Sequence, residues 1–187
     1  MKRILVVYAS RTGSTKEVAG EIARQMSSAP GKGEEIRAEA HALPMGGPGG
    51  TANSAGAETP APPDPRDWDA VVVGAPVNGM RWLPEALSFV ERNRAALASR
   101  PTAYFLLSVA LTGKGLFTKK VRSCLDPASA LAKPVALGFF GGYMSAQPPA
   151  VLRFFFGLRK DQPKDGRDWE AIGRWARETA DAFRKGW

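Results

Sequence analysis

Near its start the chain reads I-L-V-V-Y-A-S-R-T-G-S-T, from Ile4 to Thr15. Its six apolar residues are typical of a buried strand, and the S-R-T-G-S-T stretch behind them is rich in hydroxyl groups. Beyond it Val18, Ile22 and Met26 recur at every fourth position, which is the spacing of one helix face. The sequence therefore predicts a strand, a turn and a helix in direct succession.

The predicted turn has the composition of an anion site. Its hydroxyls belong to Ser10, Thr12, Ser14 and Thr15. The first N–H groups of a helix have no internal partner and carry the positive end of its dipole, so together with these hydroxyls they could surround a phosphate. Gly13 would let the backbone come close or take a positive φ. The alternative is a helix cap that binds nothing, because serine and threonine are favoured at caps.

Strand, [T/S]-x-T-G-x-T turn and helix together resemble the FMN-phosphate loop of the flavodoxin family. The sequence contains neither the P-loop string nor the dinucleotide fingerprint. The resemblance implies that the loop residues bind the phosphate of FMN: Ser10, Arg11, Thr12, Gly13, Ser14 and Thr15.

Strand-like and helical patterns alternate along the whole chain, which is typical of a parallel α/β sheet. Strands are predicted at Ile4–Ala9, Ile36–Leu43, Ala70–Gly74, Ala103–Ser108 and Val135–Phe140. Later helices are predicted at Leu83–Ala98, which Pro84 opens, at Leu116–Leu125, and at Asp168–Arg184, with Asp168 as N-cap. We expect a flavodoxin-like doubly wound sheet of five parallel strands in the order 2-1-3-4-5, with helices on both faces and ligands beyond the carboxyl ends of the strands.

Length and composition favour one folded domain over residues 1–187. The chain is 44% hydrophobic and 24% charged, which is ordinary globular usage. We expect no signal peptide, because no small-residue cleavage site follows the first apolar run. We also expect no transmembrane helix, because every apolar stretch is too short.

The segment from Pro44 to Arg66 departs from this regular pattern. Eleven of its 23 residues are Gly or Pro, which excludes a stable helix. A parallel crossover normally contains a helix, so this one is expected to be replaced or shortened by a flexible insertion. The insertion is either a solvated loop, which we favour, or a tail that binds a partner.

The chain has one cysteine, Cys124, and one histidine, His41. Disulfide frameworks and Cys/His zinc sites are therefore excluded, and no metal site is expected. His41 lies in an alternating stretch where a strand residue is expected, and Cys124 is expected to pack beside Leu125 as a small hydrophobic residue.

The turn after the third predicted strand is the second candidate loop. The flavodoxin resemblance implies that it embraces one face of the isoalloxazine ring with Pro76, Val77, Asn78, Gly79, Met80 and Trp82. Arg81 is a candidate for tuning the flavin. Two alternatives stay open for Trp82: it could stack on the ring or a substrate, or it could pack against the first turn of the following helix.

The turn after the fourth predicted strand is the third candidate loop. It comprises Ser108, Val109, Ala110, Leu111, Thr112, Gly113, Lys114 and Gly115. Electron-shuttling flavodoxins typically carry acidic residues and a stacking tyrosine here, and this sequence has neither. Lys114 could instead stabilise charge at flavin N1 and the C2 carbonyl, which would favour paired-electron chemistry.

Positive charge is concentrated in the second half of the chain. Between Arg92 and Lys160 there are eleven Lys or Arg and one acidic residue, Asp126, within a net charge of +8. Such a field attracts an anionic substrate, an acidic protein or an anionic membrane face. The sequence contains no recognisable nucleic-acid motif, so nucleic acid is not expected as a partner.

Residues 141–167 form a long basic and aromatic connection. Its stretch Val151–Lys160 contains Phe154, Phe155 and Phe156 in succession, which would fold back on the core or meet lipid, quinone or another chain.

This connection, the D-W-E run at Asp168 and the W-A-R-E run at Trp175 resemble the menaquinone-dependent protoporphyrinogen oxidases of the flavodoxin superfamily. Gly74-Ala75, Pro84 and Phe89-Val90 also fit that family. The resemblance implies an FMN-dependent oxidoreductase that oxidises protoporphyrinogen IX and passes electrons to a membrane quinone, in the cytoplasm or on the cytoplasmic face of a membrane.

Two other functions stay open. One is a flavodoxin-type electron-transfer protein that docks on an acidic redox partner. The other is an FMN-free interaction domain. No side chain is an obvious general base, so the catalytic residues are not assigned beyond Lys114 and Arg81.

Overall fold

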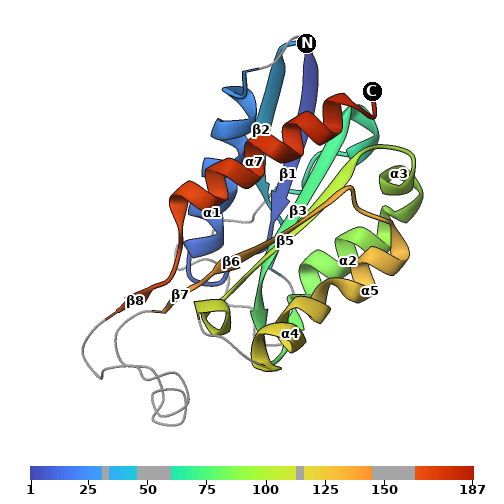
Figure 1. Ribbon diagram of the computed structural model, residues 1–187. Helices are drawn as coiled ribbons and strands as arrows, with labels where there is room; N and C mark the ends of the chain where they lie inside the picture. Colours follow the sequence, from blue (N-terminus) through green and yellow to red (C-terminus); the bar gives the residue numbers. More distant parts are fainter. Residues whose placement is uncertain (31–33, 46–59, 113–115, 145–162) are drawn as a thin grey trace.

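The computed structural model describes residues 1–30, 34–45, 60–112, 116–144 and 163–187. Strands and helices alternate along them as the sequence predicts (Figure 1). The strands are β1 (Lys2–Tyr8), β2 (Ile36–Ala42), β3 (Ala70–Asn78), β4 (Arg81–Trp82), β5 (Thr102–Ser108), β6 (Ala136–Gly141), β7 (Tyr143–Met144) and β8 (Lys164–Asp165). The α-helices are α1 (Ser14–Ser27), α2 (Pro84–Arg92), α3 (Arg94–Ala98), α4 (Leu116–Arg122), α5 (Asp126–Leu131) and α7 (Trp169–Arg184).

The central sheet has the predicted order, β2-β1-β3-β5-β6, and these five strands are parallel. Its register follows the apolar pattern, since Leu5 lies opposite Val71 and Val7 opposite Val73. The short strand β4 pairs antiparallel with the end of β3, and β7 pairs antiparallel with β8 outside the main sheet.

The sheet separates two hydrophobic cores. Alternate residues of β1 point to opposite faces, as a strand requires: Ile4 and Val6 belong to one core, and Leu5 and Val7 to the other. The first core is covered by α1 and α7, which lie side by side in Figure 1, and the second by the helices between β4 and β6. Asp168 caps α7 as predicted, because its Oδ1 accepts from the N–H of Ala171 at 2.9 Å.

The prediction of a single helix over Leu83–Ala98 is wrong, because the structure has two helices there, α2 and α3, which meet at Asn93. The side-chain amide of Asn93 donates to the carbonyl oxygen of Phe89 at 2.8 Å, and the backbone N–H of Asn93 donates to the same oxygen at 3.1 Å. Such local side-chain bonds to the backbone favour a helix end. Asn93 leaves the helical conformation, with φ −106° and ψ 13°.

The predicted helix Leu116–Leu125 ends in a 3₁₀ turn over Ser123–Leu125, and α5, which the sequence pattern did not indicate, follows at once. In the Pro44–Arg66 insertion, the described residues contain a 3₁₀ turn at Pro65–Asp67 and no α-helix, while residues 46–59 lie outside the description. Residues 141–167 were predicted as one extended connection, but their described ends pair as β7 and β8.

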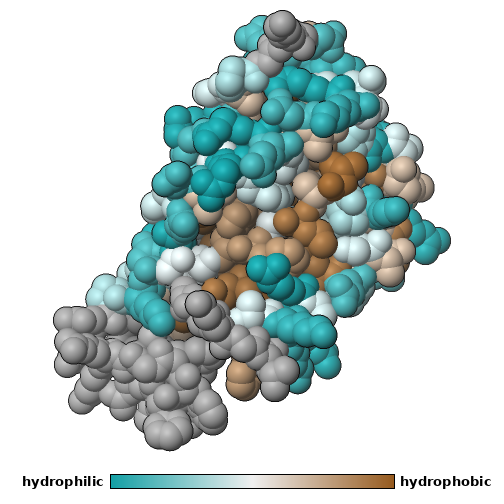
Figure 2. Space-filling view, viewed as in Figure 1, coloured by the Kyte–Doolittle hydropathy of each residue, from teal (hydrophilic) through white to brown (hydrophobic). Residues whose placement is uncertain are grey.

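Hydrophobic surface gathers in the middle of the view in Figure 2, where Figure 1 places β6. This strand forms one edge of the sheet, and Leu137 on it is 39% exposed. Along the described part of the chain, none of the helices combines the length and the apolar character needed to cross a bilayer.

Candidate functional site

The three candidate loops follow β1, β3 and β5, which are adjacent parallel strands. Parallel strands end at the same edge of a sheet, so the loops lie together at the carboxyl edge, where this architecture places its ligands. The structure therefore brings together the described parts of the three segments that the sequence singled out.

The loop after β1 has a backbone shaped for an anion. Gly13 precedes α1 with φ 89°, a left-handed conformation that glycine adopts without strain. Its N–H donates to the Oγ of Ser10 at 3.0 Å, which folds the loop back on itself. The helix begins at Ser14, so the N–H groups of its first turn point toward the loop.

Thr15 shows that this loop fits a phosphate. Its side chain is fully buried, and its Oγ1 has no hydrogen-bond partner. Leaving a buried hydroxyl unpaired costs about 1–3 kcal/mol. An oxygen-rich group bound at the helix N-terminus would supply an acceptor for it, so the residues present fit the phosphate that the sequence predicts here.

Two charged pairs surround the same loop. Arg11 lies within it, and its Nη2 is 3.7 Å from Oε1 of Glu85 in the first turn of α2. Glu17, in the first turn of α1, accepts a hydrogen bond from Arg167 at 2.8 Å. Both pairs tie the loop or its helix to distant parts of the chain, and the sequence analysis identified neither.

The second loop is a tight hairpin between β3 and β4. Val77 pairs with Trp82 and Asn78 with Arg81, which leaves Gly79 and Met80 as the two turn residues. Their φ values, 57° and 61°, match the type I′ turn that two-residue hairpins favour. Asn78, Gly79, Met80 and Arg81 are exposed, and Pro76 and Val77 are half-buried, so this loop is accessible from solvent.

Trp82 is not available to stack on a flavin. It is 4% exposed, and its indole N–H donates to the carbonyl oxygens of Ala75 and Phe105, each at 3.2 Å. Its ring lies 5.9 Å from that of Tyr104 in the core. Of the two alternatives for this side chain, stacking is wrong, and Trp82 instead shares a core with Leu83 and Ala86 at the start of α2. The reason is that β3 continues to Asn78 and β4 turns Trp82 back over the sheet.

The third loop is described in part. Val109–Thr112 form a 3₁₀ turn directly after β5, and the N–H of Ala110 donates to the Oγ of Ser108 at 3.3 Å. Ser108, Val109, Ala110 and Leu111 are all half-buried at the sheet edge. Gly113, Lys114 and Gly115 lie outside the described residues, and the role expected for Lys114 stays a prediction.

Cys124 joins the second loop to the helices that follow the third. Its thiol donates to the carbonyl oxygen of Met80 at 3.2 Å, and burial raises the pKa of that thiol. The predicted packing as a small hydrophobic residue is confirmed, since Cys124 lies against the same core as Leu125. The contact with Met80 could not be predicted from sequence spacing.

Basic side chains gather on α4, which packs against the turn after β5. Lys119, Lys120 and Arg122 are exposed there, and the guanidinium of Arg122 lies 4.6 Å from the ring centroid of Phe139. The excess positive charge seen in the sequence is therefore partly located beside the third loop.

His41 lies on β2, as expected, with its ring 6.0 Å from that of Trp68. Its Nε2 is 3.6 Å from Oε2 of Glu39. Within the part of the chain that the structure describes, no three His, Cys, Asp or Glu side chains are grouped so as to hold a metal ion.

Residues 49–148 match a family model described as a flavodoxin domain. No curated protein sequence matches the chain. Three solved structures are similar in fold, each with 15% sequence identity. An oxidoreductase from Corynebacterium diphtheriae aligns over 100% of this chain and 99% of its own, with a TM-score of 0.61.

The second is a short-chain flavodoxin associated with a PDU bacterial microcompartment, which aligns over 99% of this chain and 98% of its own, with a TM-score of 0.55. The third is a flavoprotein in complex with FMN from Lactobacillus acidophilus NCFM, which aligns over 74% and 93%, with a TM-score of 0.52.

Proposed function

The chain belongs to the flavodoxin domain family, and on that premise we propose that it is an FMN-dependent oxidoreductase. The family match covers just over half of the chain and contains the second and third loops, and the loop after β1 adds the phosphate site. The single observation that carries the proposal is the buried, unpartnered hydroxyl of Thr15 at the helix N-terminus.

Different loops of this chain hold different parts of FMN. The hydroxyl of Thr15 and the first N–H groups of α1 bind the phosphate, and Gly13 lets the backbone approach it. The exposed Gly79-Met80 turn and the half-buried 3₁₀ turn after Ser108 flank the ring. FMN supplies the electron chemistry when bound, and the protein supplies binding, orientation and charge.

The substrate we propose is protoporphyrinogen IX, with a membrane quinone as electron acceptor. The support is the resemblance of the sequence to the menaquinone-dependent protoporphyrinogen oxidases. The exposed Lys119, Lys120 and Arg122 beside the third loop add to it, because a basic surface attracts the two propionates of the porphyrinogen.

Contact with a membrane surface belongs to the same proposal. The segment Val151–Lys160, which lies outside the described residues, carries the aromatic and basic side chains expected at such a surface. Flotation with anionic liposomes at low salt is the expected result. A protein that stays with the soluble fraction would remove membrane contact from the account.

A second candidate is an electron-transfer protein that docks on an acidic redox partner. The structural similarity to a short-chain flavodoxin favours it, together with the basic residues of α4. Salt-sensitive reduction by a partner reductase, without oxidation of a small substrate, would distinguish this function from the first.

The experiment that separates the candidates is anaerobic turnover. FMN-loaded protein is mixed with protoporphyrinogen IX and a soluble menaquinone analogue, and the formation of protoporphyrin is followed by fluorescence. Formation that requires both FMN and the quinone supports the oxidase. FMN-loaded protein that produces no porphyrin excludes it and leaves the electron-transfer function.

A further inference from the structure

The side chain of Arg11 reaches from the loop after β1 to α2. Its Nη2 lies 3.7 Å from Oε1 of Glu85, in the first turn of that helix. The two helices nearest this loop cover opposite faces of the sheet, since α2 packs on one hydrophobic core and α1 on the other. The Arg11 guanidinium therefore lies on the α2 side of the sheet, whereas the N–H groups that would bind a phosphate belong to α1.

Glu85 has a fixed position beside the second loop. α2 packs on the core through Ala86 and Phe89, which are 0% and 3% exposed. Directly before the helix, the N–H of Leu83 donates to the carbonyl oxygen of Pro76 at 3.2 Å, which joins the start of α2 to the second loop. The Arg11–Glu85 pair therefore connects the first loop to the second.

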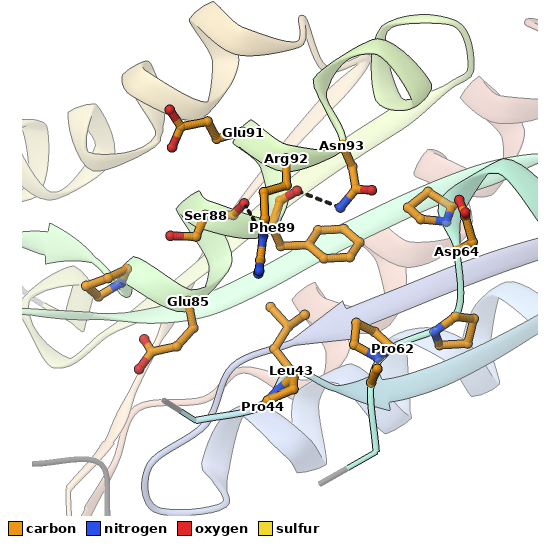
Figure 3. A pocket seen from close by; sticks show the side chains of 14 residues that line it. Leu43, Pro44, Pro62, Asp64, Glu85, Ser88, Phe89, Glu91, Arg92 and Asn93 are labelled. Atoms are coloured by element: carbon orange, nitrogen blue, oxygen red, sulfur yellow. Dashed lines mark hydrogen bonds between the residues drawn. The ribbon is translucent and has the colours of Figure 1, made fainter. Parts of the chain in front are cut away.

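The surroundings of Glu85 make Arg11 its counter-charge. The Glu85 side chain is 10% exposed and its Oε2 is buried with no hydrogen bond, whereas the Arg11 side chain is 42% exposed. In Figure 3, which looks into the cavity beside α2, the Glu85 side chain points toward the uncharged Leu43 and Pro44, and Glu91 points away. Opposite charges attract more strongly where water is partly excluded. The more buried carboxylate thus orients the more exposed arginine.

We propose that Glu85 positions the phosphate loop through Arg11, and that the Arg11 side chain acts through Glu85 and does not contact the phosphate. The proposal rests on the FMN site proposed above. The pair holds the loop that binds the phosphate against the helix that follows the second loop, which flanks the flavin ring. The phosphate is then bound by the hydroxyl of Thr15 and the first N–H groups of α1. This role differs from the direct contact that the flavodoxin resemblance implies for Arg11.

The test compares Arg11→Met, Glu85→Gln and the variant that carries both changes. Each cofactor-free protein is titrated with FMN and with riboflavin, and the dissociation constants are measured by flavin fluorescence. We expect each single change to weaken FMN binding about threefold, and the double variant to bind no more weakly than either, because all three lose the same interaction. Riboflavin lacks the phosphate, so its dissociation constants should stay unchanged. Arg11→Lys, which keeps the charge, should lose less FMN affinity than Arg11→Met.

The sign of the Glu85→Gln effect separates positioning from direct contact. If Arg11 contacted the phosphate, Glu85 would compete for the guanidinium and repel the phosphate, so its removal would tighten FMN binding. Tighter or unchanged FMN binding in Glu85→Gln would therefore overturn the proposal, as would additive losses in the double variant. Equal weakening of FMN and riboflavin would also overturn it, because the loss would then not belong to the phosphate loop.

Two further variants keep the result interpretable. Glu91→Gln is the matched control, because it makes the same change at an exposed position of α2 and should alter neither dissociation constant. If Glu85→Gln does not fold, Glu85→Asp draws the carboxylate back from Arg11 and should weaken FMN binding in the same sense. Wild-type protein that binds no FMN would contradict the FMN site itself, which distinguishes that failure from a failure of the Arg11–Glu85 pair.

Discussion

Arg167 reaches back across the fold to Glu17, 150 positions earlier, and donates to its carboxylate at 2.8 Å. The side chain of Arg167 is 8% exposed, and its guanidinium also pairs with Asp165. It lies 5.3 Å from the ring centroid of Tyr143 and 4.8 Å from that of Trp169. The contact ties the chain just after β8 to the first turn of α1.

Replacing this arginine should destabilise the protein measurably. Arg167→Met is expected to lower the free energy of unfolding by about 1–3 kcal/mol, because it removes a nearly buried side chain bonded to two carboxylates and packed against two rings. Urea denaturation measures the change. The control is Arg174→Met, whose side chain is 55% exposed and pairs with the exposed Glu170, and which should change stability by less than about 0.5 kcal/mol. Equal effects of the two changes would contradict a structural role for the Arg167 cluster.

A second buried threonine of the chain serves as the control for the proposed phosphate site. Thr15 and Thr179 are both buried, and in both the Oγ1 has no partner, but Thr179 lies on α7 in the core. Thr15→Val should weaken FMN binding about tenfold, whereas Thr179→Val should leave it unchanged. Quenching of FMN fluorescence on titration gives both dissociation constants. Unchanged affinity in Thr15→Val would place the phosphate elsewhere.

Trp82 should affect stability and not cofactor binding. Trp82→Phe removes an N–H shared by two buried carbonyl oxygens and leaves space in the core, so it should lower the unfolding free energy by about 1–3 kcal/mol. The FMN dissociation constant of the folded variant should match that of the wild type. A weakened FMN complex with unchanged denaturation would restore the stacking interpretation.

Tyr104 should make the free energy of unfolding fall at alkaline pH. Its side chain is fully buried, its hydroxyl donates to the carbonyl oxygen of Ala132 at 2.9 Å, and burial raises its pKa above the ordinary value of 10.0. The unfolded state therefore releases this proton first. The stabilisation is complete below about pH 10 and falls above it by up to about 1.4 kcal/mol per pH unit.

Tyr104→Phe should remove part of that alkaline loss while costing about 1 kcal/mol near neutral pH. Thermal unfolding from pH 8 to pH 11 measures it. Tyr8, whose pKa burial also raises, remains in both proteins, so the informative quantity is the difference between their pH profiles. If the stabilities of the wild type and Tyr104→Phe fell equally with pH, the pKa of Tyr104 would be the same in the folded and unfolded states, which would contradict this prediction.

The sequence predicts the sheet well, because its strands are nearly continuous apolar runs in a fixed alternation with helices. The order of the five parallel strands, the first helix and the Asp168 cap are all confirmed. The helix boundaries were less predictable. α2 ends before Asn93, whose side-chain amide and backbone N–H both donate to the carbonyl oxygen of Phe89, and the helical periodicity on both sides of Asn93 does not indicate this break.

The candidate site could be predicted as three loops but not as a set of contacts. The S-R-T-G-S-T motif located the first loop because its chemistry is local. The contacts of Arg11 with Glu85, Arg167 with Glu17 and Cys124 with Met80 join residues far apart in sequence, so no spacing rule indicates them. Trp82 was ambiguous because a tryptophan after a strand suits a ligand face and a core equally, and the β3–β4 turn decides between them.

The central claim is that Ser10–Thr15 hold the phosphate of FMN, and the most direct test is to compare FMN with riboflavin, which lacks that phosphate. Both are titrated into cofactor-free protein at one ionic strength, and their dissociation constants are measured by fluorescence. We predict that FMN binds at least about a hundredfold more tightly, because a phosphate at a helix N-terminus gains several charge-assisted hydrogen bonds. Equal dissociation constants for FMN and riboflavin would contradict the account.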